Sequence, residues 1–88
     1  MTWAVSFTKS ARKQFSKLSP ADRSRVLSFL NDRVADHPDP RELAKRLQGK
    51  SDELWRFRVG DLRLIVQISQ DLMTVLVIEI GHRREIYR

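Results

Sequence analysis

The stretch LWRFRVGDLRLIV, residues 54 to 66, constrains the fold more than any other part of this 88-residue chain. Apolar and charged residues alternate on both sides of Gly60-Asp61, a dipeptide that suits a two-residue hairpin turn. This pattern predicts two antiparallel strands in which Arg58 lies directly opposite Arg63. One face of the hairpin is then apolar, and the other carries Arg56, Arg58 and Arg63.

The flanking segments predict a strand over residues 2–7 and two helices, one capped by Thr8 and one by Ser19. Residues spaced by three and four form the buried stripes of these helices: Ala11, Phe15 and Leu18 in the first, and Val26, Leu27, Leu30 and Val34 in the second. The proline-rich HPDP stretch ends the second helix, and a short turn from Asp39 reaches Leu47.

After the hairpin, TVLVIEI at residues 74–80 predicts a central strand. The order β-α-α-β-β-β predicts an α+β fold, an antiparallel sheet with the helices packed on one face. A chain of this length forms one core, so residues 1–88 are expected to be a single domain.

Charge and composition narrow the range of partners. Seventeen Lys and Arg against 11 Asp and Glu give a formal net charge of +6, which favours a polyanionic partner. Cysteine is absent, which excludes disulfides, thiolate zinc sites and a cysteine nucleophile. No apolar run approaches the roughly 20 residues of a membrane span, and no signal peptide is recognisable, so a cytoplasmic protein without membrane contact is expected.

The arginine face of the hairpin predicts an anion site. Two arginines directly opposite each other destabilise a strand pair by up to about 1 kcal/mol, so folding alone does not favour them. Parity along 74–80 places Leu76, Ile78 and Ile80 in the core and turns Glu79 outward, so that Arg83, Arg84 and Tyr87 extend the basic surface. The alternative interpretation is an ordinary solvated face, with Glu79 and Glu85 as ionic partners.

Tyr87 and His82 are the titratable candidates. Neighbouring positive charge favours the phenolate of a tyrosine, which makes Tyr87 a candidate general base. His82 is a candidate phosphate ligand or proton donor, although strand parity places it on the core side. The carboxylates show no spacing for a two-metal site, so no metal or cofactor is expected. Such a site is suited to cleaving RNA, whose 2′-hydroxyl attacks the adjacent phosphate.

The stretch LWRFRVGDLRLIVQI followed by VLVIEIGHRREIYR, with FTKSARKQFSKL near the start, resembles the RelE branch of the RelE/ParE type II toxin superfamily. The resemblance implies a toxin that cleaves mRNA in the ribosomal A site and is inhibited by a cognate antitoxin. It assigns catalytic roles to Arg63, Arg83 and Tyr87. Arg63 stabilises the scissile phosphate, Arg83 stabilises the transition state or protonates the leaving oxygen, and Tyr87 activates the 2′-hydroxyl.

Arg56 and Arg58 occupy positions where some members of that branch carry lysine, and they are expected to bind RNA phosphate with Arg84 and His82. Operator DNA is expected to be bound only through an antitoxin complex. Two alternatives remain. One is a ParE-type inhibitor of DNA gyrase without nuclease activity, a branch that shares the fold but is expected to lack this set of basic residues and tyrosine. The other is an RNA-binding module in which the arginines only bind phosphate and nothing is cleaved.

Overall fold

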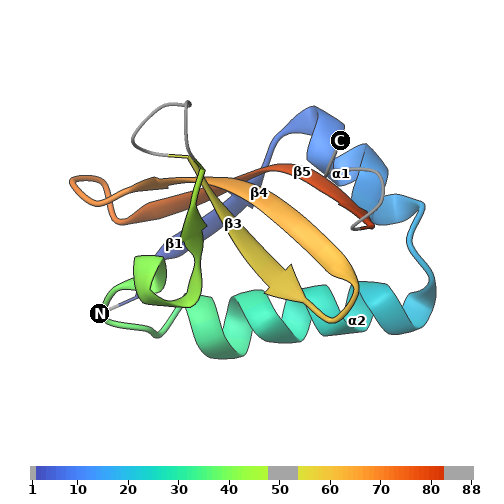
Figure 1. Cartoon of the computed structure of the whole chain (residues 1–88), viewed down its shortest axis with the longest axis horizontal. Helices are drawn as coiled ribbons and strands as arrows, with labels where there is room; N and C mark the ends of the chain where they lie inside the picture. Colours follow the sequence, from blue (N-terminus) through green and yellow to red (C-terminus); the bar gives the residue numbers. More distant parts are fainter. Residues whose placement is uncertain (1, 48–53, 83–88) are drawn as a thin grey trace.

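The computed structural model describes residues 2–47 and 54–82 (Figure 1). Along the chain the elements are strand β1 (Ala4–Phe7), helices α1 (Lys9–Ser16) and α2 (Pro20–Ser28), π-helix η1 (Phe29–Val34), 3-10 helix η2 (Pro40–Leu43), and strands β2 (Lys45–Arg46), β3 (Leu54–Val59), β4 (Leu62–Ser69) and β5 (Thr74–His82). This is the predicted α+β order with one short strand, β2, inserted before the hairpin.

The strands form one sheet in the order β1-β5-β4-β3-β2. Strands β3, β4 and β5 pair antiparallel, as predicted, and so does the unpredicted β2 with β3. Strand β1, in contrast, pairs parallel to β5, so the sheet is mixed and not wholly antiparallel. Parallel neighbours need a long connection between them, and residues 8–73, which hold both helices, supply it. Strand β1 thus reaches the edge of the sheet that is farthest from β2.

The helices pack against one face of the sheet, where α2 runs along the strands and α1 lies beside β5 (Figure 1). Phe29 and Phe57 meet edge to face across this layer at 5.2 Å between ring centroids, and Phe7 and Phe15 do so at 5.6 Å. Both helix caps form as predicted, since Thr8 Oγ1 accepts from Ala11 N at 3.0 Å and Ser19 Oγ accepts from Asp22 N at 3.2 Å.

The second predicted stripe is correct except at one residue. Val26, Leu30 and Val34 are buried, but Leu27 is 42% exposed. The buried positions are spaced by four, and Leu27 lies about 100° around the helix from Val26, outside that line. No helix within residues 2–47 and 54–82 has the length and apolar character to cross a lipid bilayer.

Strand β5 contains a bulge that changes which side chains face the helices. Ile65 lies opposite Glu79, but the next residue, Val66, lies opposite Val77, so that Ile78 is an extra residue in β5. Val75 and Val77 therefore enter the core before the bulge, and Ile80 enters it after the bulge. The predicted parity was wrong for Leu76 and Ile78, which are only half-buried, and correct for Ile80 and the exposed Glu79.

Candidate functional site

The hairpin forms in the predicted register. Val59 lies opposite Leu62, so Gly60 and Asp61 make the whole turn, and Arg58 lies directly opposite Arg63. Gly60 has φ +59°, at the first central position of the turn, which is where a type II′ turn requires glycine. The alternation then puts Phe57, Val59, Leu62 and Leu64 in the core and the arginines on the face away from the helices.

The two opposed arginines differ in their surroundings. Arg58 is exposed, whereas Arg63 is only 3% exposed. Arg63 Nη1 donates to the carbonyl oxygens of Gly60 at 3.3 Å and Leu62 at 3.1 Å, so its guanidinium folds back over the turn. The residue across from it on the other side is Gly81, which has no side chain to compete for this space. The hairpin thus presents one solvated guanidinium beside one that is held by the backbone.

Strand β2 adds a cation that the sequence did not reveal. Lys45 lies directly opposite Arg56, so both side chains project from the same face as Arg58 and Arg63. Lys45 is exposed, and Arg56 is half-buried. A strand of two residues has no periodic pattern to detect, and Lys45 was expected within a turn. The only sequence signal was the Lys45-Arg46 pair itself.

The η2 turn places β2 through a local charge pair. Asp39 Oδ1 accepts from Arg41 N at 3.1 Å and Arg41 Nε at 2.9 Å, and Asp39 Oδ2 accepts from Arg41 Nη2 at 2.8 Å. The hydrogen bond from the Arg41 side chain holds the pKa of the Asp39 carboxyl below its ordinary value. Asp39 thus caps the turn that delivers Lys45 to the edge of β3.

Glu79 lies in the same cross-strand row as Lys45 and Arg56, but Ile65 separates it from Arg56. The ion pairs among the described residues include none between Glu79 and any arginine, and none that involves Arg58. The alternative interpretation named Glu79 and Glu85 as ionic partners of this face; the described contacts do not support it for Glu79, and Glu85 lies outside the described residues. The face carries Lys45, Arg56, Arg58 and Arg63 against this single carboxylate in the described part of the sheet.

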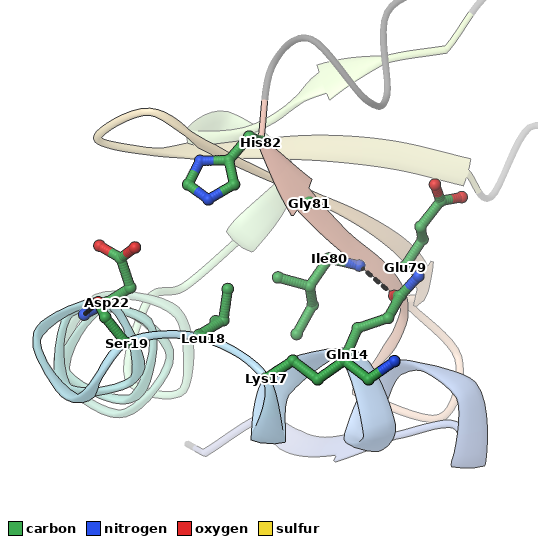
Figure 2. Close-up of a pocket in the computed structure, with 9 residues that line it drawn as sticks. All are labelled: Gln14, Lys17, Leu18, Ser19, Asp22, Glu79, Ile80, Gly81 and His82. Carbon is green, nitrogen blue, oxygen red and sulfur yellow. Dashed lines mark hydrogen bonds between the residues drawn. The ribbon is translucent and has the colours of Figure 1, made fainter.

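His82 lies on the other side of β5 from the hairpin arginines. It is opposite Leu62, on the side of the helices as strand parity predicted, and it is exposed because it ends the strand. With Asp22 and Lys17 it borders a pocket of about 460 Å³ between α1, the start of α2 and the end of β5 (Figure 2). The structure therefore does not bring His82 together with Arg56, Arg58 and Arg63.

Helix α1 holds the end of β5 where β1 no longer does. The β1 ladder ends at Phe7 opposite Val77, after which Thr8 Oγ1 donates to Ile78 O at 3.3 Å and Gln14 Oε1 accepts from Ile80 N at 2.7 Å (Figure 2). These side chains replace a neighbouring strand at the open edge. Sequence analysis missed Gln14, because nothing in a helical stripe indicates a partner 66 residues away. Three predicted site residues, Arg83, Arg84 and Tyr87, lie outside the described residues.

Comparison with known proteins identifies the family. Residues 5–87 match a protein family that is described as the ParE toxin of the type II toxin-antitoxin system parDE. The chain is also 30% identical to Toxin RelG of Mycobacterium tuberculosis over 88 residues, which are 100% of this chain and 99% of the relative. The chain belongs to the RelE/ParE superfamily of type II toxins.

Solved structures place this RelE/ParE toxin with the RelE branch. The RelBE2 toxin-antitoxin complex of Mycobacterium tuberculosis contains a chain that matches with a TM-score of 0.81 and 27% identity, over 94% of this toxin and 93% of that chain. The archaeal RelE-RelB complex of Pyrococcus horikoshii matches with a TM-score of 0.73 and 29% identity, over 94% and 97%. The predicted membership of the RelE branch and the predicted α+β fold class are both confirmed.

Proposed function

We propose that this toxin is a ribosome-dependent mRNA endonuclease. Its substrate is mRNA in the ribosomal A site, and a cognate antitoxin inhibits it. The observation that carries the proposal is the Arg58-Arg63 pair on the hairpin face away from the helices, where Arg58 is exposed and Arg63 is buried, with Lys45 opposite Arg56 on the same face. Like charges directly opposite each other, as at Arg58 and Arg63, disfavour a strand pair, and guanidinium groups bind phosphate through paired N–H groups.

The orientation of Arg63 supports a role at a single phosphate. A guanidinium is planar and binds phosphate through two parallel N–H groups, so its orientation decides which oxygens it can reach. The bonds from Arg63 Nη1 to Gly60 O and Leu62 O fix that orientation before any RNA arrives. Such a fixed donor is suited to stabilising charge that develops in a transition state. The exposed Arg58 and Lys45 are suited to binding the neighbouring phosphates.

The proposed reaction needs no group beyond the side chains and the RNA. Tyr87 removes the proton of the 2′-hydroxyl, the resulting oxygen attacks the adjacent phosphorus, and the bond from phosphorus to the 5′-oxygen breaks. Arg83 stabilises the charge on phosphorus or protonates the departing oxygen. The products are a 2′,3′-cyclic phosphate and a 5′-hydroxyl. DNA has no 2′-hydroxyl and is not a substrate of this chemistry.

The proposed antitoxin is a protein that covers the basic surface in the resting cell. The similar structures from Mycobacterium tuberculosis and Pyrococcus horikoshii are complexes of a RelE toxin with a RelB antitoxin. A net charge of +6 favours an antitoxin segment rich in acidic residues. Because ribosomes are the site of action, the toxin is proposed to act in the cytoplasm, and any operator DNA contact runs through the antitoxin.

The decisive experiment incubates the purified toxin with mRNA-programmed ribosomes, with and without a chelator of free transition metals. Magnesium stays present so that the ribosomes remain intact. We expect cleavage at defined codon positions that survives chelation, and we expect Arg83→Ala and Tyr87→Phe to lose most of it. Arg33→Ala is the matched control, because Arg33 is an exposed arginine of η1, outside the hairpin, whose guanidinium carbon lies 5.9 Å from the centroid of the Phe29 ring.

The second candidate function is inhibition of DNA gyrase. The observation that favours it is the family match, whose description is that of a ParE toxin. The same protein preparation tests this candidate in a gyrase supercoiling reaction. Intact message in every lane together with gyrase-dependent DNA breaks would replace the nuclease proposal. RNA binding without cleavage in either reaction would indicate a non-catalytic RNA-binding module.

A further inference from the structure

The outward side of α1 carries cations without any anion. Residues 1–21 contain no Asp or Glu, and the basic residues within them are Lys9, Arg12, Lys13 and Lys17. All four are exposed, and they recur at spacings of three and four along α1 and its C-cap. Side chains at these spacings lie on one side of a helix, so the four form a single basic stripe, the α1 stripe.

The α1 stripe has no ionic partner among the described residues. None of its four side chains takes part in the described salt bridges, whereas the neighbouring α2 pairs Arg25 with Asp22 at 3.7 Å. Arg23 of α2 likewise donates to the carbonyl oxygens of Ser16 and Leu18. The four cations of α1 are therefore exposed to solvent without a described ionic partner. In α2, by contrast, Arg25 forms an ion pair and Arg23 forms hydrogen bonds with backbone carbonyls.

The stripe works against the stability of its own helix. Lys9 and Lys13 are four residues apart, as are Lys13 and Lys17, and like charges at this spacing destabilise a helix. Lys9 also opens the helix, where the dipole disfavours a cation, and the first turn holds no acid to compensate. The dipole favours Lys13 and Lys17 at the end of the helix, so folding accounts for those two but not for Lys9 and Arg12, whereas a bound polyanion accounts for all four.

We infer that the α1 stripe binds the phosphate backbone of a folded RNA. The other exposed residues of α1, Ser10 and Ser16, are polar, the Ser16 hydroxyl donating to Lys13 O at 2.7 Å, and no exposed apolar side chain lies among the cations. Protein interfaces need an apolar centre and are depleted in lysine, whereas nucleic-acid interfaces are polar and strongly positive. The surface therefore fits RNA better than an acidic protein segment.

The α1 stripe is separate from the hairpin arginines but adjoins the strand that leads toward Arg83. Helix α1 packs on the helix side of the sheet against β5, and Gln14 bonds Ile80 N (Figures 1 and 2). Lys17 lines the same pocket as His82, the last residue of β5. A folded RNA on α1 would thus lie beside the end of β5, while the hairpin arginines face the other side of the sheet. Only the choice of RNA as the polyanion rests on the proposed function.

The test measures binding of the full chain to a blunt RNA duplex as the salt concentration varies. K9Q/K13Q removes two charges from the α1 stripe, and R25Q/R33Q removes two exposed charges from α2 and η1 as the matched control. We expect K9Q/K13Q to bind the duplex several-fold more weakly and to lower the slope of log K against log salt by about 2. Its thermal midpoint should stay unchanged or rise, because it removes a repulsive pair.

Three results would overturn the inference. An equal loss in both double variants would mean that net charge alone governs binding. Unchanged duplex binding by K9Q/K13Q would mean that the stripe is an ordinary solvated face. In a parallel titration with poly-glutamate as the probe, loss of poly-glutamate binding by K9Q/K13Q with retention of duplex binding would assign the stripe to an acidic protein. Codon-specific cleavage is measured separately, so a toxin that does not cut RNA fails the proposed function without deciding this surface.

Discussion

The toxin carries two basic surfaces that differ in how tightly their charges are held. On the hairpin face, Arg63 is 3% exposed and bonded to the carbonyl oxygens of its own turn. On the α1 stripe, all four cations are exposed and unpaired among the described residues. A held guanidinium recognises one phosphate in one orientation, whereas flexible lysines contribute a diffuse attraction to any phosphate nearby. The hairpin face is therefore suited to the proposed reaction at one phosphate, and the α1 stripe is suited to binding the RNA backbone.

Replacing Arg63 should give the largest effect on the hairpin side of this comparison. We expect Arg63→Ala to lower the rate of mRNA cleavage by about 100- to 1000-fold, the cost of removing one preorganised donor from a charged transition state. Arg63→Lys should rescue little, because an ammonium has no planar fork. The measurement is single-turnover cleavage on programmed ribosomes, with circular dichroism to confirm folding. A variant that unfolds would show that Arg63 serves the turn and not the phosphate.

The Arg63 result also bears on what a sequence can predict. The register of the hairpin was predictable because it is local, set by a two-residue turn and an alternation of period two. The burial of Arg63 was not, because it depends on the path of a long side chain and on Gly81, which the fold brings from a strand 18 residues later. For the same reason the bulge at Ile78 and the parallel β1-β5 pair escaped prediction, since both are fixed by contacts between remote segments.

Removing the side-chain acceptor at Gln14 should give the next largest effect, on the α1 side. Gln14→Leu leaves Ile80 N without its partner at 2.7 Å, and an unpaired buried N–H costs about 1–3 kcal/mol of unfolding free energy. Gln14→Glu keeps an acceptor at the same reach and should recover most of the loss. Urea denaturation measures the stability, and amide hydrogen exchange at Ile80 reports the local bond. Equal stability in both variants would contradict the role of Gln14 as a strand substitute.

Lys45 tests whether the hairpin face extends across β2. We expect Lys45→Ala to reduce the salt slope of RNA binding by about 1 and to leave stability nearly unchanged, because Lys45 is exposed. The neighbouring Arg46→Ala removes the same charge from the opposite face of the same strand. The salt dependence of RNA affinity is compared for the two variants. If both lose the same slope, the face on which the charge lies is irrelevant and the contrast between the two surfaces weakens.

The smallest effect concerns Asp39, which holds η2 and so fixes where Lys45 joins the sheet. The Arg41 side chain lowers the pKa of Asp39 in the folded toxin below its ordinary value of 3.8. The unfolded chain then binds the proton more readily, so the stabilisation is fully present above the unfolded pKa and disappears as the pH falls through the folded pKa.

Thermal melts of the toxin and of Asp39→Asn should differ by at most a few degrees near neutral pH, because the pair is partly exposed and screened. The difference should begin to shrink as the pH falls below the ordinary value of 3.8, where Asp39 of the unfolded chain takes up a proton, and it should vanish only below the lower pKa of the folded chain. A difference that persists undiminished into acid would show that the cap acts by geometry alone. In that case the position of Lys45, and with it the reach of the hairpin face, would be independent of pH.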